Sequence, residues 1–559
     1  MDARPVGDGL GELFARPDRF TVLTELVPWR GTLADDAGAR ARAFAADLRG
    51  LPGVDAVSVT DGAGGRLALS AETVAADLAA AGQRVLVHVT CRDRNRNELA
   101  ALGWRLGGAG LTDILVLSGD YPREGYLGVA RPVFDLDSVS LLQLYSTLGR
   151  TGAGADLLAR PPARDVHRDV AELAAAGSAR GPHQAVPLHL GAAVNPFKTL
   201  ARDAVPQYLK LELKARAGAR FAITQSGYDA RKLHELIRVV ADRGLSLRLL
   251  QSVFVLSAGS ARAFRAGRIP GVDVSDELLA VAERQSASHD KGRAFFLELA
   301  AKQLLVARGL GYVGAVLSGL SRAEDVGRVL DLAAAHDPAD WRALLPDVSW
   351  SRPGSFWLYP PDPATGLTGS EPADWPAPRR RPLPYLVGRW AHRGFTPGSP
   401  WSAALRRVVD STEGRPAGRA LHIVEQAIKL PLYDCRDCGD CSLPDIAFLC
   451  PESQCVKSQR NGPCGGSLDG ECEVPGRDCM WARAYDRFAA DGTAASMLDR
   501  PVAVQDNALR RTSAWANALA GRDLHGRRRA TPDPAPAPAP VPATIPAPAP
   551  PVAEFVPRS

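Results

Sequence analysis

The sequence predicts an α/β protein: a (β/α)8 TIM barrel followed by a small Cys-rich metal-binding module and a disordered Pro-Ala tail. Three observations support this prediction. Eight short apolar runs alternate with longer Ala-, Leu- and Arg-rich stretches between residues 20 and 320. Polar residues end most of these runs. Finally, eight of the nine cysteines lie between Cys435 and Cys479.

The eight apolar runs are rich in β-branched residues, so we expect them to be strands. An open doubly wound sheet would use the same alternation of strands and helices, but eight strands within about 300 residues favour a closed barrel. The expected strands cover 20–27, 54–60, 84–90, 113–118, 186–194, 220–225, 247–256 and 312–317.

Composition limits the function classes. The chain has 559 residues, 46% hydrophobic and 23% charged, and no apolar run long enough to cross a bilayer, so we expect no membrane association. A net charge of +5 gives little attraction for a polyanion, so nucleic acid is not an expected partner. Residues 1–19 contain no apolar stretch typical of a secretory signal, so we expect a cytoplasmic protein.

The chain divides into four segments by composition. Residues 1–335 are expected to form the barrel. Residues 336–415 contain many Pro and Trp residues with little periodicity, and are expected to be an irregular connecting region. Residues 416–490 form the Cys-rich module, and 491–559 are a C-terminal extension. Its Pro-Ala stretch, 531–552, cannot bury a core and is expected to be disordered.

Two acids are the candidate catalytic residues at the rim of the barrel. The carboxyl ends of the strands converge on one rim, where barrel enzymes keep their active sites. Glu25 ends the first strand, where burial would raise the pKa of its carboxyl toward a useful value for a general acid. The alternative is an ion pair with Arg30. Asp120 follows Gly119 in LSGD, and the alternative there is a structural turn.

Other rim features are less specific. His88 points to the same mouth, but a single His at a strand end is more often a hydrogen-bonded core residue than a catalyst. Cys91 has no paired base and is interpreted as a packing residue. The glycines of 61–66 (DGAGGR) do not match a dinucleotide fingerprint, so they indicate a loop. No Walker A, H-E-x-x-H or G-x-S-x-G pattern is present.

Six motifs carry a resemblance to a known family. TELVPWRG, the Thr60-Asp61 turn, HVTCRDRN, LSGDYP, AAVNPF and FAITQSGYD occur in the order found in the methylenetetrahydrofolate reductase family. That family folds as a flavin-binding (β/α)8 barrel. The resemblance implies a reductase that uses flavin-mediated hydride transfer to convert 5,10-methylenetetrahydrofolate to 5-methyltetrahydrofolate in one-carbon and methionine metabolism.

The resemblance also implies roles for individual residues. Glu25 matches the general acid, and Asp120 matches an acid near the flavin and the pterin. Glu25, Asp120 and Gln225 would contact the folate. FAD is the implied cofactor, with FMN as the alternative, because Ser118 and Asn195 depart from the Arg and Tyr of many members. The implied flavin contacts are Thr60, His88, Leu117, Ser118, Gly119, Asp120, Asn195 and Lys214.

The cysteine cluster is the most specific signal in the chain. Its spacing is C-x2-C-x2-C-x8-C-x4-C-x8-C-x7-C-x6-C. Thiols so close in a reducing compartment indicate metal ligation rather than disulfides. A [4Fe–4S] cluster and zinc both accept four thiolates, and eight ligands can hold two sites. The expected ligands are Cys435, Cys438, Cys441, Cys450, Cys455, Cys464, Cys472 and Cys479.

The module also resembles the C-terminal module associated with methylenetetrahydrofolate reductases, which elsewhere is a separate partner subunit. Its fusion to the barrel implies that the two units cooperate. The electron donor is NAD(P)H or a ferredoxin-like protein, and a homo-oligomer is a further expectation. The alternative hypothesis is a redox-inactive folate-binding or methyl-transfer component whose module is a zinc docking domain.

Overall fold

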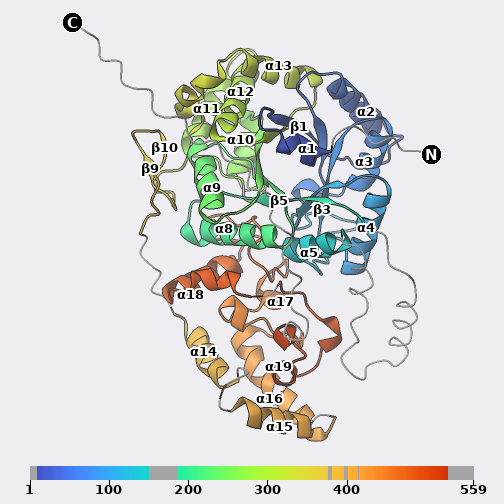
Figure 1. Ribbon diagram of the computed structural model, residues 1–559, viewed down its shortest axis with the longest axis vertical. Helices are drawn as coiled ribbons and strands as arrows, with labels where there is room; N and C mark the ends of the chain where they lie inside the picture. The colour runs from blue at the N-terminus through green and yellow to red at the C-terminus, as the bar shows by residue number, and fades with distance from the viewer. Residues whose placement is uncertain are drawn as a thin grey trace.

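We describe a computed structural model of the chain, which covers residues 9–149, 185–374, 381–395, 399, 401–412, 414–500 and 502–526. The eight expected strands all form, and they pair side by side in chain order as a closed barrel (Figure 1). The strands are β1 (Thr21–Leu26), β2 (Ala56–Val59), β3 (Val85–Thr90), β4 (Asp113–Leu117), β5 (His189–Val194), β6 (Phe221–Thr224), β7 (Arg248–Phe254) and β8 (Gly314–Ser318).

Every neighbouring pair is parallel, including the pair of β1 and β8 that closes the barrel. In the closing pair Thr21 lies opposite Gly314. A Cβ at Gly314 would lie 2.2 Å from the carbonyl oxygen of Thr21, so only glycine lets β8 approach β1 this closely. The prediction of a closed barrel, rather than an open sheet, is confirmed.

Helices between the strands cover the outside of the barrel (Figure 1). Because the strands are buried on both faces, they are almost continuously apolar. The covering helices are α2 (Asp36–Arg49), α3 (Ala71–Ala80), α4 (Arg96–Gly108), α5 (Ser138–Leu148), α8 (Ala201–Arg216), α9 (Ala230–Asp242), α10 (Ala258–Arg265), α11 (Asp276–Ser286), α12 (Arg293–Leu310) and α13 (Ala323–Ala334).

A short N-terminal helix, α1 (Leu10–Ala15), plugs one end of the barrel. Leu10 and Phe14 pack with the inward-facing side chains of the strands. The backbone N–H of Leu10 donates to Asp113, the first residue of β4, at 3.3 Å. The plug therefore lies at the amino ends of the strands, which leaves the carboxyl ends to form the site.

The connecting region contains more regular structure than the sequence predicted. It holds a 3-10 helix (Pro338–Val348), the short antiparallel pair β9 (Pro361–Asp362) and β10 (Leu367–Thr368), and helices α14 (Leu383–Phe395) and α15 (Ser402–Thr412). The prediction of an irregular segment was wrong for these stretches. The prolines before each helix make its helical apolar pattern hard to recognise in the sequence. Helix α14 also packs on the module, where its Tyr385 ring lies 6.0 Å from that of Phe448.

The Cys-rich module is built from loops around short helices. It begins with α16 (Pro416–Tyr433) and contains α17 (Pro451–Gln454) and α18 (Met480–Ala490); α19 (Ala514–Leu519) follows. Figure 1 shows the module beside α5 and α8 of the barrel. The Pro-Ala stretch 531–552 lies outside the described residues, and the segment boundaries drawn from composition remain predictions.

Buried polar contacts hold the module to the barrel. Lys198 Nζ donates to the carbonyl oxygen of Gly465 at 2.8 Å. Asp203 of α8 accepts from the Ser467 hydroxyl and from the Gly470 N–H, both at 2.7 Å. Both barrel side chains are almost fully buried, so docking of the module is part of the fold. None of the helices in the described ranges has the length and apolar character needed to cross a membrane.

Candidate functional site

The carboxyl ends of the strands and one loop of the Cys-rich module enclose a cavity of about 240 Å³, here called the rim cavity. Its floor is apolar and includes Leu115, Ile223 and Val316 from inside the barrel. The ten barrel residues singled out in the sequence all line it: Glu25, Thr60, His88, Leu117, Ser118, Gly119, Asp120, Asn195, Lys214 and Gln225. The structure therefore brings them together, while their individual roles remain predictions.

Glu25 faces the rim cavity from the end of β1. Burial raises the pKa of its carboxyl to about 7. Arg30, the partner in the alternative interpretation, forms its ion pair with Glu124 instead, at 2.8 Å. Within the described part of the chain no cation pairs with Glu25. With this pKa, about half of the Glu25 carboxyls hold a proton at pH 7, and that proton can be donated.

Asp120 lies on the opposite wall, in the loop that follows β4. Its carboxylate accepts a hydrogen bond from the backbone N–H of Gly64 at 2.7 Å. Gly64 belongs to the glycine-rich stretch 61–66 and has a positive φ of 68°. The stretch is thus a loop, as the sequence indicated, and its function is to support the Asp120 side of the rim.

The ends of β2 and β3 contribute neutral polar groups. His88 Nε2 lies 2.8 Å from the Ser58 hydroxyl, and burial lowers the pKa of His88 to about 4, so its ring is neutral at pH 7. The Thr60 hydroxyl is buried in the cavity wall without a hydrogen-bond partner among the described residues. Cys91 is buried in the barrel core, and burial raises the pKa of its thiol, as fits a packing residue.

The polar side chains beside β5 and β6 already have hydrogen-bond partners within the protein. Lys214 Nζ donates to the Ala193 carbonyl oxygen at 2.6 Å, and burial lowers the pKa of Lys214 to about 7. The Asn195 amide donates to Gly271 at 2.7 Å. The Gln225 amide donates to Pro270 at 3.3 Å. These two amides hold the loop after α10 against the cavity, which leaves them less free to bind a ligand than the sequence suggested.

The module contributes residues that sequence reasoning missed. Lys457, Cys464, Gly465, Gly466 and Glu473 line the rim cavity together with the barrel residues. The glycine run in RNGPCGG was the one available signal. A Cβ at Gly466 would lie 2.0 Å from the Glu473 carboxylate, so a larger residue there would displace the Glu473 side chain that lines the cavity. The cavity is therefore shared between barrel and module.

A module glutamine connects two barrel side chains at the same wall. Gln459 accepts from the Ser118 hydroxyl and from Lys210 Nζ, both at 3.0 Å. The Gln207 side-chain amide nitrogen, also in this wall, is buried without a partner in the described ranges. Ser118, expected to contact a flavin, thus has its hydroxyl bonded to the module.

The eight module thiols fall into two neighbourhoods. Burial is the largest cause that raises the pKa of each shifted thiol, and a neighbouring thiol adds to it. Cys450 raises the pKa of Cys435, Cys438 and Cys441. Cys464 does the same for Cys455, Cys472 and Cys479. We call these sets of four the first and the second thiol group.

The four residues of the second thiol group line one small cavity of about 20 Å³. Cys464 lines the rim cavity as well, so this group lies beside the candidate active site. Four thiolates suit zinc or an iron–sulfur cluster. Among the described residues, no group of three or more Cys, His, Asp or Glu side chains is arranged to hold a metal ion.

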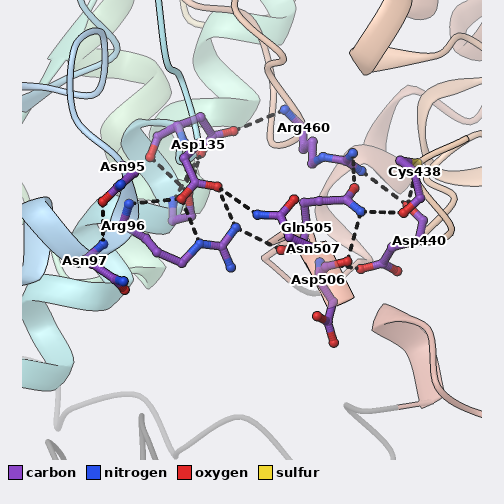
Figure 2. A network of polar contacts seen from close by, with 12 residues as sticks. Asn95, Arg96, Asn97, Asp135, Cys438, Asp440, Arg460, Gln505, Asp506 and Asn507 are labelled. Carbon is purple, nitrogen blue, oxygen red and sulfur yellow. Dashed lines mark hydrogen bonds and ion pairs between the residues drawn. The ribbon is translucent and has the colours of Figure 1, made fainter. Parts of the chain in front are cut away.

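A second cavity, of about 450 Å³, lies between the barrel and the module. Figure 2 shows its polar network. Arg96 makes a two-point contact with Asp135, at 2.8 and 2.6 Å, and donates to the Gln505 carbonyl oxygen at 2.9 Å. The Gln505 amide donates to the Cys438 carbonyl oxygen at 2.8 Å. The network thus joins the barrel to the loop that carries the first thiol group.

The charges of the second cavity balance one another. Its lining includes three arginines and three carboxylates. Arg96 pairs with Asp135 at 2.6 Å, while Arg460 and Arg510 both pair with Glu452, at 2.8 and 3.3 Å. Module residues 457–460 border both cavities, since Lys457 lines the first and Arg460 the second.

The rim cavity has polar atoms that suit a flavin ring. Buried polar atoms normally have partners, so the Thr60 hydroxyl and the Gln207 amide are open to a ligand with matching polar atoms. The volume of the rim cavity limits the size of the ligand more strictly. Sites for drug-sized ligands have roughly 300–1,000 Å³, so about 240 Å³ suits the ring system of a flavin or a pterin. A whole dinucleotide would need further space.

Two family models match the chain. Residues 39–149 match the model described as "Methylenetetrahydrofolate reductase", and residues 417–508 match "Methylene-tetrahydrofolate reductase C terminal". The resemblance inferred from the motifs is confirmed for both parts of the chain, and with it the fusion of a methylenetetrahydrofolate reductase domain to the C-terminal module. No curated protein matches the sequence.

Two solved structures are similar to part of the chain. One is an uncharacterised protein from Clostridium thermocellum that binds two copies of 5-methyl-5,6,7,8-tetrahydrofolic acid; identity is 10% and the TM-score 0.38, over 58% of this chain and 97% of that one. The other is 2,3-dimethylmalate lyase of the PEP mutase/isocitrate lyase superfamily, at 12% identity and a TM-score of 0.30, over 59% and 86%. Likeness at this level carries no inference about function.

Proposed function

We propose that this chain is a methylenetetrahydrofolate reductase, which reduces the methylene bridge of 5,10-methylenetetrahydrofolate to the methyl group of 5-methyltetrahydrofolate. One observation carries the proposal: Glu25, whose carboxyl has a pKa raised to about 7 by burial, shares a cavity with Asp120. The two family-model matches support it independently. The role in one-carbon and methionine metabolism follows from this reaction.

The rim cavity is the proposed site of the flavin ring, and the folate would bind against that ring on the side of Glu25 and Asp120. A reduced flavin bound there would supply the hydride. Thr60, His88 and Lys214 are the barrel residues that would hold it, with the Gln207 amide as an added donor. Gln225 and Asp120 would contact the pterin. FAD is the proposed form, and FMN, which is smaller, is the alternative that the volume of the rim cavity favours.

The two acids have separate tasks in this proposal. Opening of the methylene bridge releases an amine nitrogen, which needs a proton, and leaves an iminium cation on the folate. Glu25 gives its proton to that nitrogen and becomes a carboxylate. The Asp120 carboxylate stabilises the cation electrostatically until the methylene carbon accepts the hydride and becomes the methyl group.

The module would hold metal through its two thiol groups. The C-x2-C-x2-C spacing of the first group suits a [4Fe–4S] cluster, and the four thiolates of the second group would hold zinc or a second cluster. An iron–sulfur cluster would allow electrons to come from a ferredoxin-like donor. A module with zinc alone would leave NAD(P)H as the direct reductant of the flavin.

The proposal is tested on full-length protein purified without oxygen. Its visible spectrum is recorded, and iron, zinc and acid-labile sulfide are assayed on the same sample. Turnover of 5,10-methylenetetrahydrofolate is then measured with NADH, NADPH and reduced ferredoxin. Flavin bands together with formation of 5-methyltetrahydrofolate are expected. A protein that binds flavin but forms no methyl product with any of the three donors would refute the reductase.

One structural observation favours a second candidate, a redox-inactive folate-binding component of a methyl-transfer assembly. The Ser118 hydroxyl and the Gly119 carbonyl, both expected flavin contacts, are bonded to module residues Gln459 and Lys457. With these contacts in place, the cavity would hold a pterin and no flavin. This candidate predicts a protein without flavin absorbance that binds 5-methyltetrahydrofolate in a calorimetric titration.

A further inference from the structure

Two buried side chains of the module contact the rim loop that carries Asp120. Lys457 Nζ donates to the carbonyl oxygen of Gly119 at 2.6 Å. The Glu473 carboxylate accepts from the backbone N–H of Tyr121 at 2.7 Å. Asp120 stands between these two backbone groups, so the module contacts the chain immediately before and immediately after it.

The two module residues also pair with each other. Lys457 Nζ lies 2.7 Å from the second oxygen of Glu473, and the side chains are only 3% and 2% exposed. The contacts therefore form a closed ring: Gly119, Lys457, Glu473 and Tyr121, with Asp120 inside it. The charge pair resists distortion, because separating Lys457 from Glu473 would leave two buried charges without their partners.

We propose that Lys457 and Glu473 are positioning residues for Asp120, so that the barrel holds this acid in its working place only when the module is docked. The proposal rests on the role of Asp120 in the proposed function. Without the ring, the Asp120 loop keeps its hydrogen bond from Gly64 and the contact between Ser118 and Gln459. Neither of these contacts fixes the backbone on both sides of Asp120.

The ring also ties the rim to the second thiol group. Lys457 follows Cys455 by two positions, and Glu473 follows Cys472 directly. A metal ion bound to these thiols would fix the two short segments that carry the ring. The second thiol group would then help to hold the rim loop in position. This role does not depend on whether a bound metal is redox active.

The test uses full-length protein and steady-state kinetics with 5,10-methylenetetrahydrofolate. Lys457→Met keeps the length of the side chain and removes its charge. We expect kcat to fall roughly 10- to 100-fold with KM nearly unchanged, since a displacement of about 1 Å at a reacting group costs rates of this order. Lys457→Arg keeps the charge and should recover most of the rate. If Lys457→Met fails to fold, Glu473→Gln replaces it as the test variant.

A double-mutant comparison separates positioning from simple docking. If Lys457 acts through Asp120, then Lys457→Met should have less than about a threefold further effect on kcat in an Asp120→Asn background. The matched control is Asp203→Ala, which removes two module contacts of α8 without touching the rim loop. Because the other docking contacts, such as that of Lys198 with Gly465, stay in place, the module remains docked, and the effect of Asp203→Ala on kcat should be the same in both backgrounds. An equally large effect of Lys457→Met in both backgrounds would overturn the proposal.

Hydrogen exchange gives a readout that does not depend on catalysis. The Tyr121 amide donates to Glu473, so peptides covering residues 117–124 should exchange faster in Lys457→Met, and should not do so preferentially in Asp203→Ala. Unchanged exchange in this peptide would refute the ring. Faster exchange in a protein that shows no reductase activity would instead refute the proposed function and leave the ring standing.

Discussion

Replacement of Glu25 by glutamine tests the assigned general acid most sharply. Burial raises the pKa of this carboxyl from 4.5 to about 7. At 1.36 kcal/mol per pKa unit, this corresponds to a preference of about 3 kcal/mol for the protonated form. Glutamine keeps the shape of the protonated carboxyl but has no proton to give. We expect the rate of methylene reduction to fall about 10²- to 10⁴-fold, the usual contribution of a general acid.

The assay isolates the proton-dependent step. The protein is reduced with dithionite without oxygen and mixed rapidly with 5,10-methylenetetrahydrofolate, and the return of the flavin band is followed across pH. Because the protonated form is the active one, the wild-type rate should be constant below pH 7 and fall about tenfold per pH unit above it. The Glu25→Gln rate should be low and independent of pH. A wild-type rate in Glu25→Gln would refute the assignment.

The stability of Glu25→Gln gives an independent check, because the substitution that lowers the rate should raise the free energy of unfolding at high pH. The pKa of Glu25 is higher in the folded chain than in the unfolded one, so its stabilising contribution is complete below about pH 4.5 and is lost as pH rises through about 7. Glu25→Gln avoids that loss. At pH 8 the variant should therefore be more stable than wild type, by at most about 3 kcal/mol in urea unfolding. A less stable variant at pH 8 would contradict the pKa assigned here.

Three further predictions follow from single observations. Gly119→Ala would place a Cβ 2.9 Å from that of Thr90 at a φ of +86°, and should lower the free energy of unfolding by about 2–4 kcal/mol; Gly110→Ala, at a φ of +73° with nothing within 4 Å, should cost only about 1 kcal/mol. Thr60→Val removes a buried hydroxyl that has no partner in the ligand-free chain, so it should not lower the ligand-free stability; it should weaken flavin retention about fivefold, because the bound flavin loses one hydrogen bond worth about 1 kcal/mol. The eight module thiols should resist alkylation until a chelator removes their metal, which mass spectrometry of the alkylated peptides would check.

The barrel could be predicted from the sequence because its signals are local. Each strand is a short apolar run, and a strand's carboxyl end is marked by a polar residue such as Glu25 or Thr60. Closure of the barrel then brings those ends together without any further information. For this reason the strand-end residues of the rim cavity lie together, as the sequence predicted, whereas Lys214, which lies on α8, was named only from the family resemblance.

The module's share of the site could not be predicted in the same way. Lys457 and Gly119 are 338 positions apart, and no spacing rule connects them. Their contact depends on how α8 receives the module through Lys198 and Asp203. Spacing also left the partition of the thiols open, since consecutive sets of four become visible only when the loops are placed in space. Helix α14 was missed although its apolar residues follow a helical period, because Pro382 and Pro384 at its start indicate an irregular segment.

A single-turnover experiment tests the central claim most directly. Protein purified without oxygen is reduced, mixed with excess 5,10-methylenetetrahydrofolate and quenched, and the folates are identified by mass spectrometry. The account predicts about one 5-methyltetrahydrofolate for each bound flavin, and almost none from Glu25→Gln at the same time point. A protein that binds the folate yet returns it unreduced would contradict the account and favour the redox-inactive folate-binding alternative.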